Sequence, residues 1–395
     1  MTASPARLLA ATVAATSVGL GLATGTGPLV GPVAAEFGVP RSAVAGMLAA
    51  TLALTLGLGV VTGPWSQRHG PRPLVVLGAV AIPAGLLVLA RTGSFPVAAA
   101  GFALGVGGGA GCLFVPLQTA VGAAFARHRA AALVVASAGA GLATVVAPPV
   151  TVALVGALGV RGTAVALAVI AAVVVGVCVP ATPVGRGDAT ATTAGLRTAL
   201  ADPAFRRFVL GAVGVCAAMF VPFVHLASFA TMRGAALATG AVLVAVAGTA
   251  SLLARLAAVP AVARWGAWTV CRVGGAALVA SVTGWLLADG SSVRLAAFAV
   301  VFGLGHGAFV GVSGAAVAEL FGVAGFGLRL GTMHLAAGTG ALLGPALAGV
   351  AADAAGSPSA GIAVAAALGV TGCAVFLSAR SSERAGQREG LGQRG

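Results

Sequence analysis

The segment GPWSQRHGPR, residues 63–72, follows a long apolar run, and the segment PAVARWGAW, residues 260–268, follows another. Arg68 and Arg264 hold corresponding places in these two segments and lie 196 residues apart. A second pair of similar segments, AGAGLATVVAPP at 138–149 and AGTGALLGPALAG at 337–349, has nearly the same offset, since Gly139 and Gly338 lie 199 residues apart. Agreement between the two offsets predicts a chain built from two similar halves.

The composition indicates that these halves lie in a membrane. Of the 395 residues 59% are hydrophobic and only 8% are charged, and the mean hydropathy is +1.07. Soluble domains average roughly 45–50% apolar and about 25% charged residues. A water-soluble fold of this length would have to expose much of that apolar side chain, because its surface must still meet water. The sequence therefore predicts an integral membrane protein.

Twelve apolar runs are long enough to cross a bilayer as helices, which takes about 20 residues each. The predicted fold is an all-α integral membrane protein with twelve transmembrane helices in two six-helix bundles. No small-residue cleavage site stands out before Glu36, so the first run is interpreted as a helix rather than a signal peptide. The runs lie at 7–30, 42–65, 73–91, 95–124, 130–155, 161–180, 206–229, 236–261, 268–288, 293–320, 328–351 and 358–379.

The longest polar segment, 180–207, separates the sixth run from the seventh and is interpreted as a cytoplasmic linker. The predicted organisation follows from it: an N-terminal bundle at 1–180, a linker at 181–205, a C-terminal bundle at 206–379 and a cytoplasmic tail at 380–395.

The charges predict an orientation. The net charge is +14 and every basic residue is arginine, a composition typical of a GC-rich bacterial genome. These arginines are scattered singly between apolar runs, so a nucleic-acid partner is not expected. With the N-terminus inside, 16 of them fall on the inner side and 5 on the outer side, which predicts two cytoplasmic termini in the cytoplasmic membrane. The five cysteines have no paired spacing, so we expect packing residues and no metal or other cofactor.

Nearly the whole chain resembles the major facilitator superfamily of transporters. The loop after the second span is similar to that superfamily's signature of glycine, an acidic residue, arginine, glycine and arginine, which here reads Gly63, Gln67, Arg68, Gly70 and Arg72. The acidic position is occupied by Gln67, a departure from the pattern that puts the charge relay of this loop in doubt. The second-half copy has no acid before Arg264 either.

Four stretches are similar to the monocarboxylate and oxalate:formate branch of the superfamily: 123–149, 251–266, 302–322 and 338–353. The resemblance implies a secondary active transporter that moves a small, monocarboxylate-like organic anion by alternating access, with proton coupling or anion exchange. It also implies the role of Arg255, because an arginine in the same place of that branch is held to meet the substrate carboxylate.

The chain departs from that branch at two positions. Ser251 stands where the animal members have an aspartate, and Leu29 stands where they have a lysine.

Arg255 is the most informative polar residue within a span. An arginine at the centre of a membrane helix costs about 2.5–3.5 kcal/mol on insertion scales. Its planar fork of donors suits a carboxylate, which it can grip with two charge-assisted hydrogen bonds. The alternatives are that its long side chain reaches the inner interface or forms a structural pair.

Other polar residues within the spans are candidates for the same cavity. His306 could carry a coupled proton, or be a neutral histidine bonded to a backbone carbonyl. His334, Gln118, Thr119 and Thr26 are candidate substrate contacts, although hydroxyl groups in spans more often serve helix packing.

A further set of residues is assigned to coupling or gating. His306 belongs here as well as to the cavity. Glu319 could form a gate ion pair or be an interface charge, and Pro148 and Pro345 could be bend points or static kinks. The arginines of this set are Arg68 and Arg72.

Other function classes fit less well. The sequence has no nucleophile–base pair, metal-ligand cluster or phosphate loop, so an enzyme is not expected. A channel or sensor would not need two repeated halves. The main rival is an efflux carrier for apolar drugs or metabolites. The expected partners are a small carboxylate substrate, protons and membrane lipid, and the protein is expected to be a monomer.

Overall fold

The computed structural model describes residues 4–184, 195–232, 237–287 and 291–379, so the predicted tail at 380–395 lies outside the described residues. Ten helical segments in this part are long and apolar enough to cross a membrane. One of them, Arg129–Ala181, has 53 residues, about 80 Å of helix against a hydrocarbon core of about 30 Å. It breaks at Gly159, where φ is 66° and ψ is −176°, between the two spans predicted there. With α12, Ala267–Trp285, these segments supply twelve spans, and the predicted all-α membrane fold is confirmed.

Several spans are built from more than one helical piece, because glycine or proline interrupts them. The first half consists of α1 (Pro5–Thr24), η1 (Gly27–Leu29), α2 (Val30–Phe37), α3 (Arg41–Gly57), α4 (Gly59–His69), α5 (Arg72–Arg91), α6 (Phe95–Phe102), the π-helical η2 (Ala103–Gly107), α7 (Gly108–Ala124), α8 (Arg129–Cys178) and η3 (Val179–Ala181). The second half follows the short helix α9 (Leu196–Ala201) and consists of α10 (Pro203–Met232), α11 (Leu237–Trp265), α12, α13 (Ser292–Phe321), α14 (Phe326–Ala355) and α15 (Pro358–Leu377).

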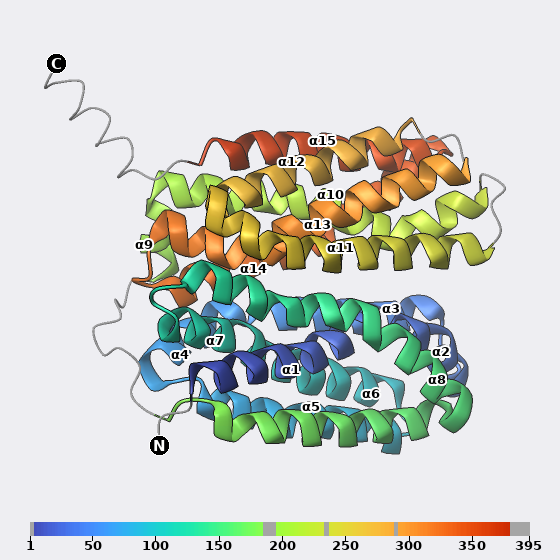
Figure 1. Cartoon of the computed structure of the whole chain (residues 1–395). Helices are drawn as coiled ribbons and strands as arrows, with labels where there is room; N and C mark the ends of the chain where they lie inside the picture. The colour runs from blue at the N-terminus through green and yellow to red at the C-terminus, as the bar shows by residue number, and fades with distance from the viewer. Residues whose placement is uncertain (1–3, 185–194, 233–236, 288–290, 380–395) are drawn as a thin grey trace, which may run out of the picture.

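The two halves form two helical bundles that lie one above the other in Figure 1. α1 begins and α15 ends at the same end of the molecule, where α9 also lies. We call this end the termini end and the opposite one the far end. The even number of passes places the start of α1 and the end of α15 on the same side.

The two halves repeat one another in their packing. α1 packs along α8 as α10 packs along α14. A Cβ built on Gly139 of α8 would lie 2.7 Å from the Val13 carbonyl oxygen, and one built on Gly340 of α14 would lie 2.8 Å from the Val213 carbonyl oxygen. The structure therefore matches Gly139 with Gly340, at an offset of 201. The alignment of the two halves by sequence paired Gly139 with Gly338, but Gly338 packs against Leu56 of the first half.

The turns after α4 and α11 also correspond. Gly70 has φ 82° and ψ 160°, and Gly266 has φ 81° and ψ 154°. Residues with a side chain rarely adopt such positive φ values, so glycine is needed at both turns. The two glycines lie 196 residues apart, the same offset as Arg68 and Arg264.

Candidate functional site

Arg255 lies in α11 and reaches into the first half. Its side chain is 2% exposed, and its Nη1 donates a hydrogen bond of 3.0 Å to the backbone carbonyl of Ser137 in α8. Its Nε is buried without a hydrogen-bond partner among the described residues. Ten residues, about 15 Å of helix, separate it from Trp265 at the end of α11. The guanidinium therefore joins the two halves in the interior and does not reach the interface.

Two glycines form the slot that holds the Arg255 side chain. A Cβ on Gly141 of α8 would lie 2.9 Å from the Arg255 Cδ, and one on Gly311 of α13 would lie 2.9 Å from its Cγ. The Ser137 Oγ lies 2.8 Å from the Gly311 carbonyl and 2.7 Å from the Val134 carbonyl of its own helix, and its one proton is available to either. The same serine thus contacts the second half twice. Side chains larger than hydrogen at either glycine would displace the arginine.

A second contact between the halves is made by backbone against backbone. α4 of the first half crosses α14 of the second at Gly59 and Gly63 on one helix and Gly327 and Gly331 on the other. A Cβ on Gly331 would lie 2.1 Å from the Gly59 carbonyl oxygen, and one on Gly63 would lie 2.2 Å from the Gly327 carbonyl oxygen. Small residues four apart let two membrane helices approach this closely.

Gln67 extends this crossing toward the termini end. Its Oε1 accepts a hydrogen bond of 2.8 Å from the backbone N–H of Gly327, in the first turn of α14. Its Nε2 makes only a weak contact of 3.5 Å with the Val323 carbonyl. The residue at the acidic position of the signature thus satisfies one of the open donors of a helix N-terminus, although it carries no charge.

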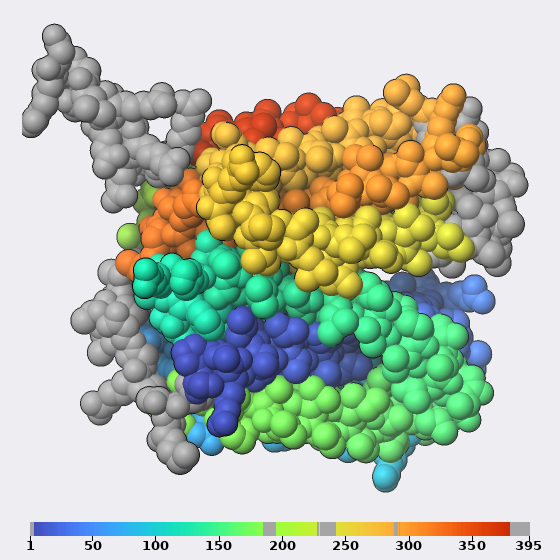
Figure 2. All heavy atoms as spheres, in the orientation of Figure 1, coloured from blue at the N-terminus to red at the C-terminus, as the bar shows by residue number. Residues whose placement is uncertain are grey.

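These contacts close the molecule toward the termini end. Figure 2 shows α8 and α11 in contact there, with the two halves drawing apart toward the far end. Glycine crossings and short hydrogen bonds hold the closed side, where helices of one half lie directly on helices of the other. The conformation is that of a two-bundle protein closed on one side of the membrane.

His306 lies half-buried on α13, within the second half. Its Nδ1 is 2.9 Å from the Ser251 Oγ on α11, and its ring lies 5.5 Å from that of Phe223 on α10. α11 and α13 are close enough for this bond because Gly307 packs against the Ser251 carbonyl, where a Cβ would lie at 2.1 Å. His306 therefore bonds a hydroxyl, on the residue one turn before Arg255.

His334 and Gln118 lie at contacts between the halves. The His334 Nδ1 is 2.8 Å from its own helix's Leu330 carbonyl, and its ring meets that of Phe114 in the first half edge-on, with centroids 4.6 Å apart. Gln118 is buried in α7, and a Cβ on Gly314 of α13 would lie 3.0 Å from its Oε1.

The predicted threonine contacts are occupied locally. Thr119 donates to the Val115 carbonyl at 2.8 Å, and Thr26 donates to the Leu22 carbonyl at 3.0 Å. Both hydroxyl protons are used four residues back along the chain, which agrees with the helix-packing alternative.

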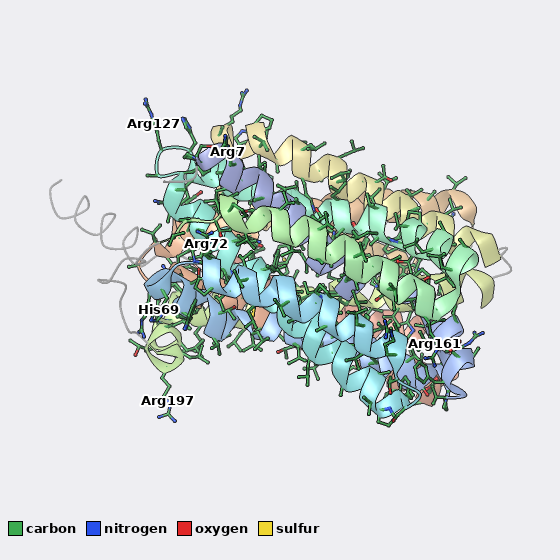
Figure 3. The ribbon with its side chains drawn as sticks, turned by 90° about the horizontal axis from the view of Figure 1, so that it is seen from below. Arg7, His69, Arg72, Arg127, Arg161 and Arg197 are labelled. Carbon is green, nitrogen blue, oxygen red and sulfur yellow. The ribbon has the colours of Figure 1, made fainter. Side chains whose placement is uncertain are left out.

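The predicted gating residues occupy different places. Arg68 is exposed and Arg72 is partly buried at the termini end. Figure 3 shows Arg72 at that end with Arg7, His69, Arg127 and Arg197, whereas Arg161 lies at the far end; there Arg161 pairs with Glu36 at 2.7 Å.

Glu319 caps a helix of its own half. Its Oε2 accepts from the backbone N–H groups of Ala267 and Trp268, at 2.5 and 3.3 Å, at the start of α12. A carboxylate is stabilised there by the helix dipole. Pro148 and Pro345 lie inside α8 and α14 as predicted.

Two contributors were missed by sequence reasoning, Ser137 and the glycine crossing of α4 with α14. Ser137 is an ordinary small residue in an apolar run and carries no signal. The crossing did carry one, because glycines four apart occur on both helices, at 59 and 63 and at 327 and 331. By the offset of 196, moreover, Arg255 is the counterpart of Gly59, so corresponding positions of the two halves both lie where the halves meet.

Comparisons with known proteins agree with this architecture. The family model described as Major Facilitator Superfamily matches residues 8–298. The chain is 26% identical over 292 residues to the fujikurins efflux protein of Gibberella fujikuroi, covering 71% of this chain and 61% of that protein's length. It is 29% identical over 336 residues to monocarboxylate transporter 11 of Mus musculus, covering 79% and 73% of the two chains.

Solved structures show the same fold. The human organic anion transporter MFSD10 (TETRAN) superposes with a TM-score of 0.75 at 17% identity, covering 94% of this chain and 99% of that one. The transporter FucP, in an outward conformation, superposes with a TM-score of 0.72 at 14% identity, covering 93% and 97% of the two chains.

Proposed function

The chain belongs to the major facilitator superfamily, and on that premise we propose that it moves a small, monocarboxylate-like organic anion across the cytoplasmic membrane by alternating access. As a member of this family it is a multi-pass membrane transporter and not an enzyme. The mouse relative named a monocarboxylate transporter supports the substrate class.

The observation that carries the proposal is the state of Arg255. Its buried guanidinium has one neutral carbonyl as a hydrogen-bond acceptor, and its Nε has none among the described residues. A buried charge with so few partners is costly. A carboxylate would supply a counter-charge and two parallel acceptors, an arrangement that Arg is shaped to accept. Arg255 is therefore suited to bind an anion.

The same bond connects anion binding with the closed conformation. The carbonyl that Arg255 binds belongs to Ser137, in the opposite half. An anion that accepts the hydrogen bond from Nη1 replaces the Ser137 carbonyl and removes this link between α11 and α8. The contact of α4 with α14 remains. Binding then favours opening of the termini end, because the ligand's affinity differs between the two conformations.

His306 is proposed as the residue that couples transport to protons. The His306 Nδ1 contacts the hydroxyl of Ser251, and Ser251 lies one helical turn before Arg255 on α11. Exchange of two anions at Arg255 is the alternative coupling.

The remaining proposals concern topology and assembly. The arginines at the termini end (Figure 3) support a cytoplasmic location for that end. The organisation into 1–180, 181–205, 206–379 and 380–395, and a monomeric state, are proposed with it.

A second candidate function is export of apolar compounds. It is favoured by the relative named an efflux protein, which matches over 71% of this chain. An apolar substrate would not need the charge of Arg255.

Flux in proteoliposomes tests the proposal. The purified chain is reconstituted, and uptake of radiolabelled lactate is compared with that of an apolar dye, with and without an imposed pH gradient. We expect saturable lactate uptake, which a gradient accelerates if protons are coupled and which internal lactate accelerates if anions are exchanged. Transport of the dye without any lactate flux would favour the efflux function and refute the proposed one.

A further inference from the structure

A cavity of about 460 Å³ lies inside the second half, at the far end of the molecule. Its walls belong to α10, α12, α14, α15 and the turn between the last two helices. It therefore lies within one bundle, open at a rim, and is separate from the contact between the halves that holds Arg255. Its volume falls in the range of roughly 300–1,000 Å³ typical of sites for small organic molecules.

Four polar side chains line this mainly apolar cavity, and one of them, Ser357, lies in the turn between α14 and α15. The other three lie on helices. Trp285 is fully buried, and its Nε1 donor has no hydrogen-bond partner among the described residues. The His225 Nε2 is 3.1 Å from the Pro345 carbonyl; since a carbonyl only accepts, this nitrogen carries the proton and Nδ1 is left as an acceptor. Asp353, the one acidic side chain among the described lining residues, is exposed at the rim.

At the corresponding place in the first half the two helices touch. There a Cβ on Gly25, the residue that follows α1, would lie 2.4 Å from the Ala147 Cβ of α8. The counterparts at offsets of 200 and 201 are His225 of α10 and Ala348 of α14, and both line the cavity. The His225 imidazole thus replaces Gly25, the residue at which the first half makes its close contact with α8.

The other two polar groups on the helices are also particular to the second half. Trp285 corresponds to Leu89 at the offset of 196, and Asp353 corresponds to Val152 at the offset of 201. These three helical residues thus replace groups without a polar side chain, and Ser357 lies in the turn outside the helices compared. Apolar residues at these three positions would pack the helices equally well. The polar side chains therefore indicate a ligand.

We infer that this cavity is a second binding site, which takes an amphiphilic organic amine from the far side of the membrane. Its ammonium group pairs with the Asp353 carboxylate at the rim and donates to the His225 Nδ1. Its apolar tail lies against Phe229 and Trp285, whose rings are 5.2 Å apart. The two rings give the tail an apolar surface, and an oxygen on the tail would satisfy the Trp285 Nε1.

Tryptophan fluorescence of the full chain in lipid nanodiscs tests the site. The chain has four tryptophans and no tyrosine, and Trp285→Phe identifies the contribution of the cavity. The probe is hexylamine, with hexanol as its neutral analogue and empty nanodiscs to correct for partition into lipid. We expect a saturable change with hexylamine that is lost in Trp285→Phe.

The carboxylate variant decides the chemistry. Asp353→Asn changes an exposed side chain, so it should fold, and we expect it to weaken hexylamine binding about fivefold while hexanol binding stays unchanged. Glu36→Gln is the matched control, because it removes another far-end carboxylate outside the cavity, and it should have no effect. Arg255→Ala should also leave hexylamine binding intact. Equal affinities for hexylamine and hexanol, or equal hexylamine binding by wild type and Asp353→Asn, would overturn the inference.

Discussion

Substituting Gly331 by alanine should open the termini end of the molecule. The three atoms nearest to a Cβ at this position are backbone atoms of Gly59 and Val60, at 2.1 to 2.6 Å. All three belong to α4 of the opposite half, so the added methyl group leaves the packing within the second half untouched. The clash exists only while the two halves are closed against each other.

The size of the effect follows from that geometry. Ordinary van der Waals contacts of a Cβ begin near 3.4 Å, so α4 and α14 must separate by about 1 Å or more. Overpacking of this kind costs about 1–3 kcal/mol. A cost of about 2 kcal/mol moves the ratio of closed to open molecules about thirtyfold toward the open form.

Distances between spin labels measure this ratio. The labels are placed on cysteines substituted for Arg68 and Arg264, which are exposed at corresponding places of the two halves. The five native cysteines are buried. The chain without the two introduced cysteines is treated with the same label, to confirm that the native cysteines do not react. We expect a longer-distance population at the termini end in Gly331→Ala.

Gly248→Ala is the matched control. Gly248 also lies within a spanning helix, α11, but a Cβ built on it would have no atom of a neighbouring helix within 4 Å among the described residues. Its distance distribution should be that of the wild type. Unchanged distances in Gly331→Ala, or an equal shift in both variants, would refute the argument that the glycine crossing holds the closed conformation.

Three further predictions use the same preparations. Gln67→Glu places a charge at the N-terminus of α14 in exchange for a weak 3.5 Å contact, so the ratio of closed to open molecules should rise up to about fivefold. Gln67→Leu should lower this ratio. Glu319→Gln keeps an acceptor oxygen for the α12 amides but removes the charge that the helix dipole stabilises, so it should lower the free energy of unfolding by up to about 1 kcal/mol. The label distances should stay unchanged, since a changed distance would indicate a gate. Ser251→Ala should lower kcat/KM for lactate about fivefold by removing the hydrogen bond to His306, and Ser251→Thr should restore it; full activity of the alanine variant would exclude the proposed role of His306.

The sequence predicted the membrane fold and its halves because both depend on hydrophobic length and local repetition. The break at Gly159 fell between two predicted spans, and the offset of 196 matched Gly70 with Gly266. The offset taken from Gly139 was wrong by two residues. Similar glycine- and alanine-rich segments align almost equally well in several registers, and only the contact with the neighbouring helix decides among them.

The site was less predictable, because it depends on which helices of opposite halves meet. Arg255 was recognised from its cost in a membrane, but its partner is a backbone carbonyl, which no side-chain pattern reveals. Glu319 was interpreted as a gate charge or an interface charge, because it is acidic and lies near Arg329 in the chain. The structure places its carboxylate on the amides of α12, a contact set by the tertiary packing of α13 against that helix.

The central claim, that Arg255 binds the transported anion, is tested most directly by lactate uptake into proteoliposomes carrying wild type, Arg255→Lys or Arg255→Ala. Each variant is reconstituted at equal protein content after its folding has been checked by thermal unfolding. The proposed role predicts reduced uptake by the lysine variant, which keeps the charge but loses the fork of donors, and no uptake above empty liposomes by the alanine variant. Normal uptake by Arg255→Ala would contradict it.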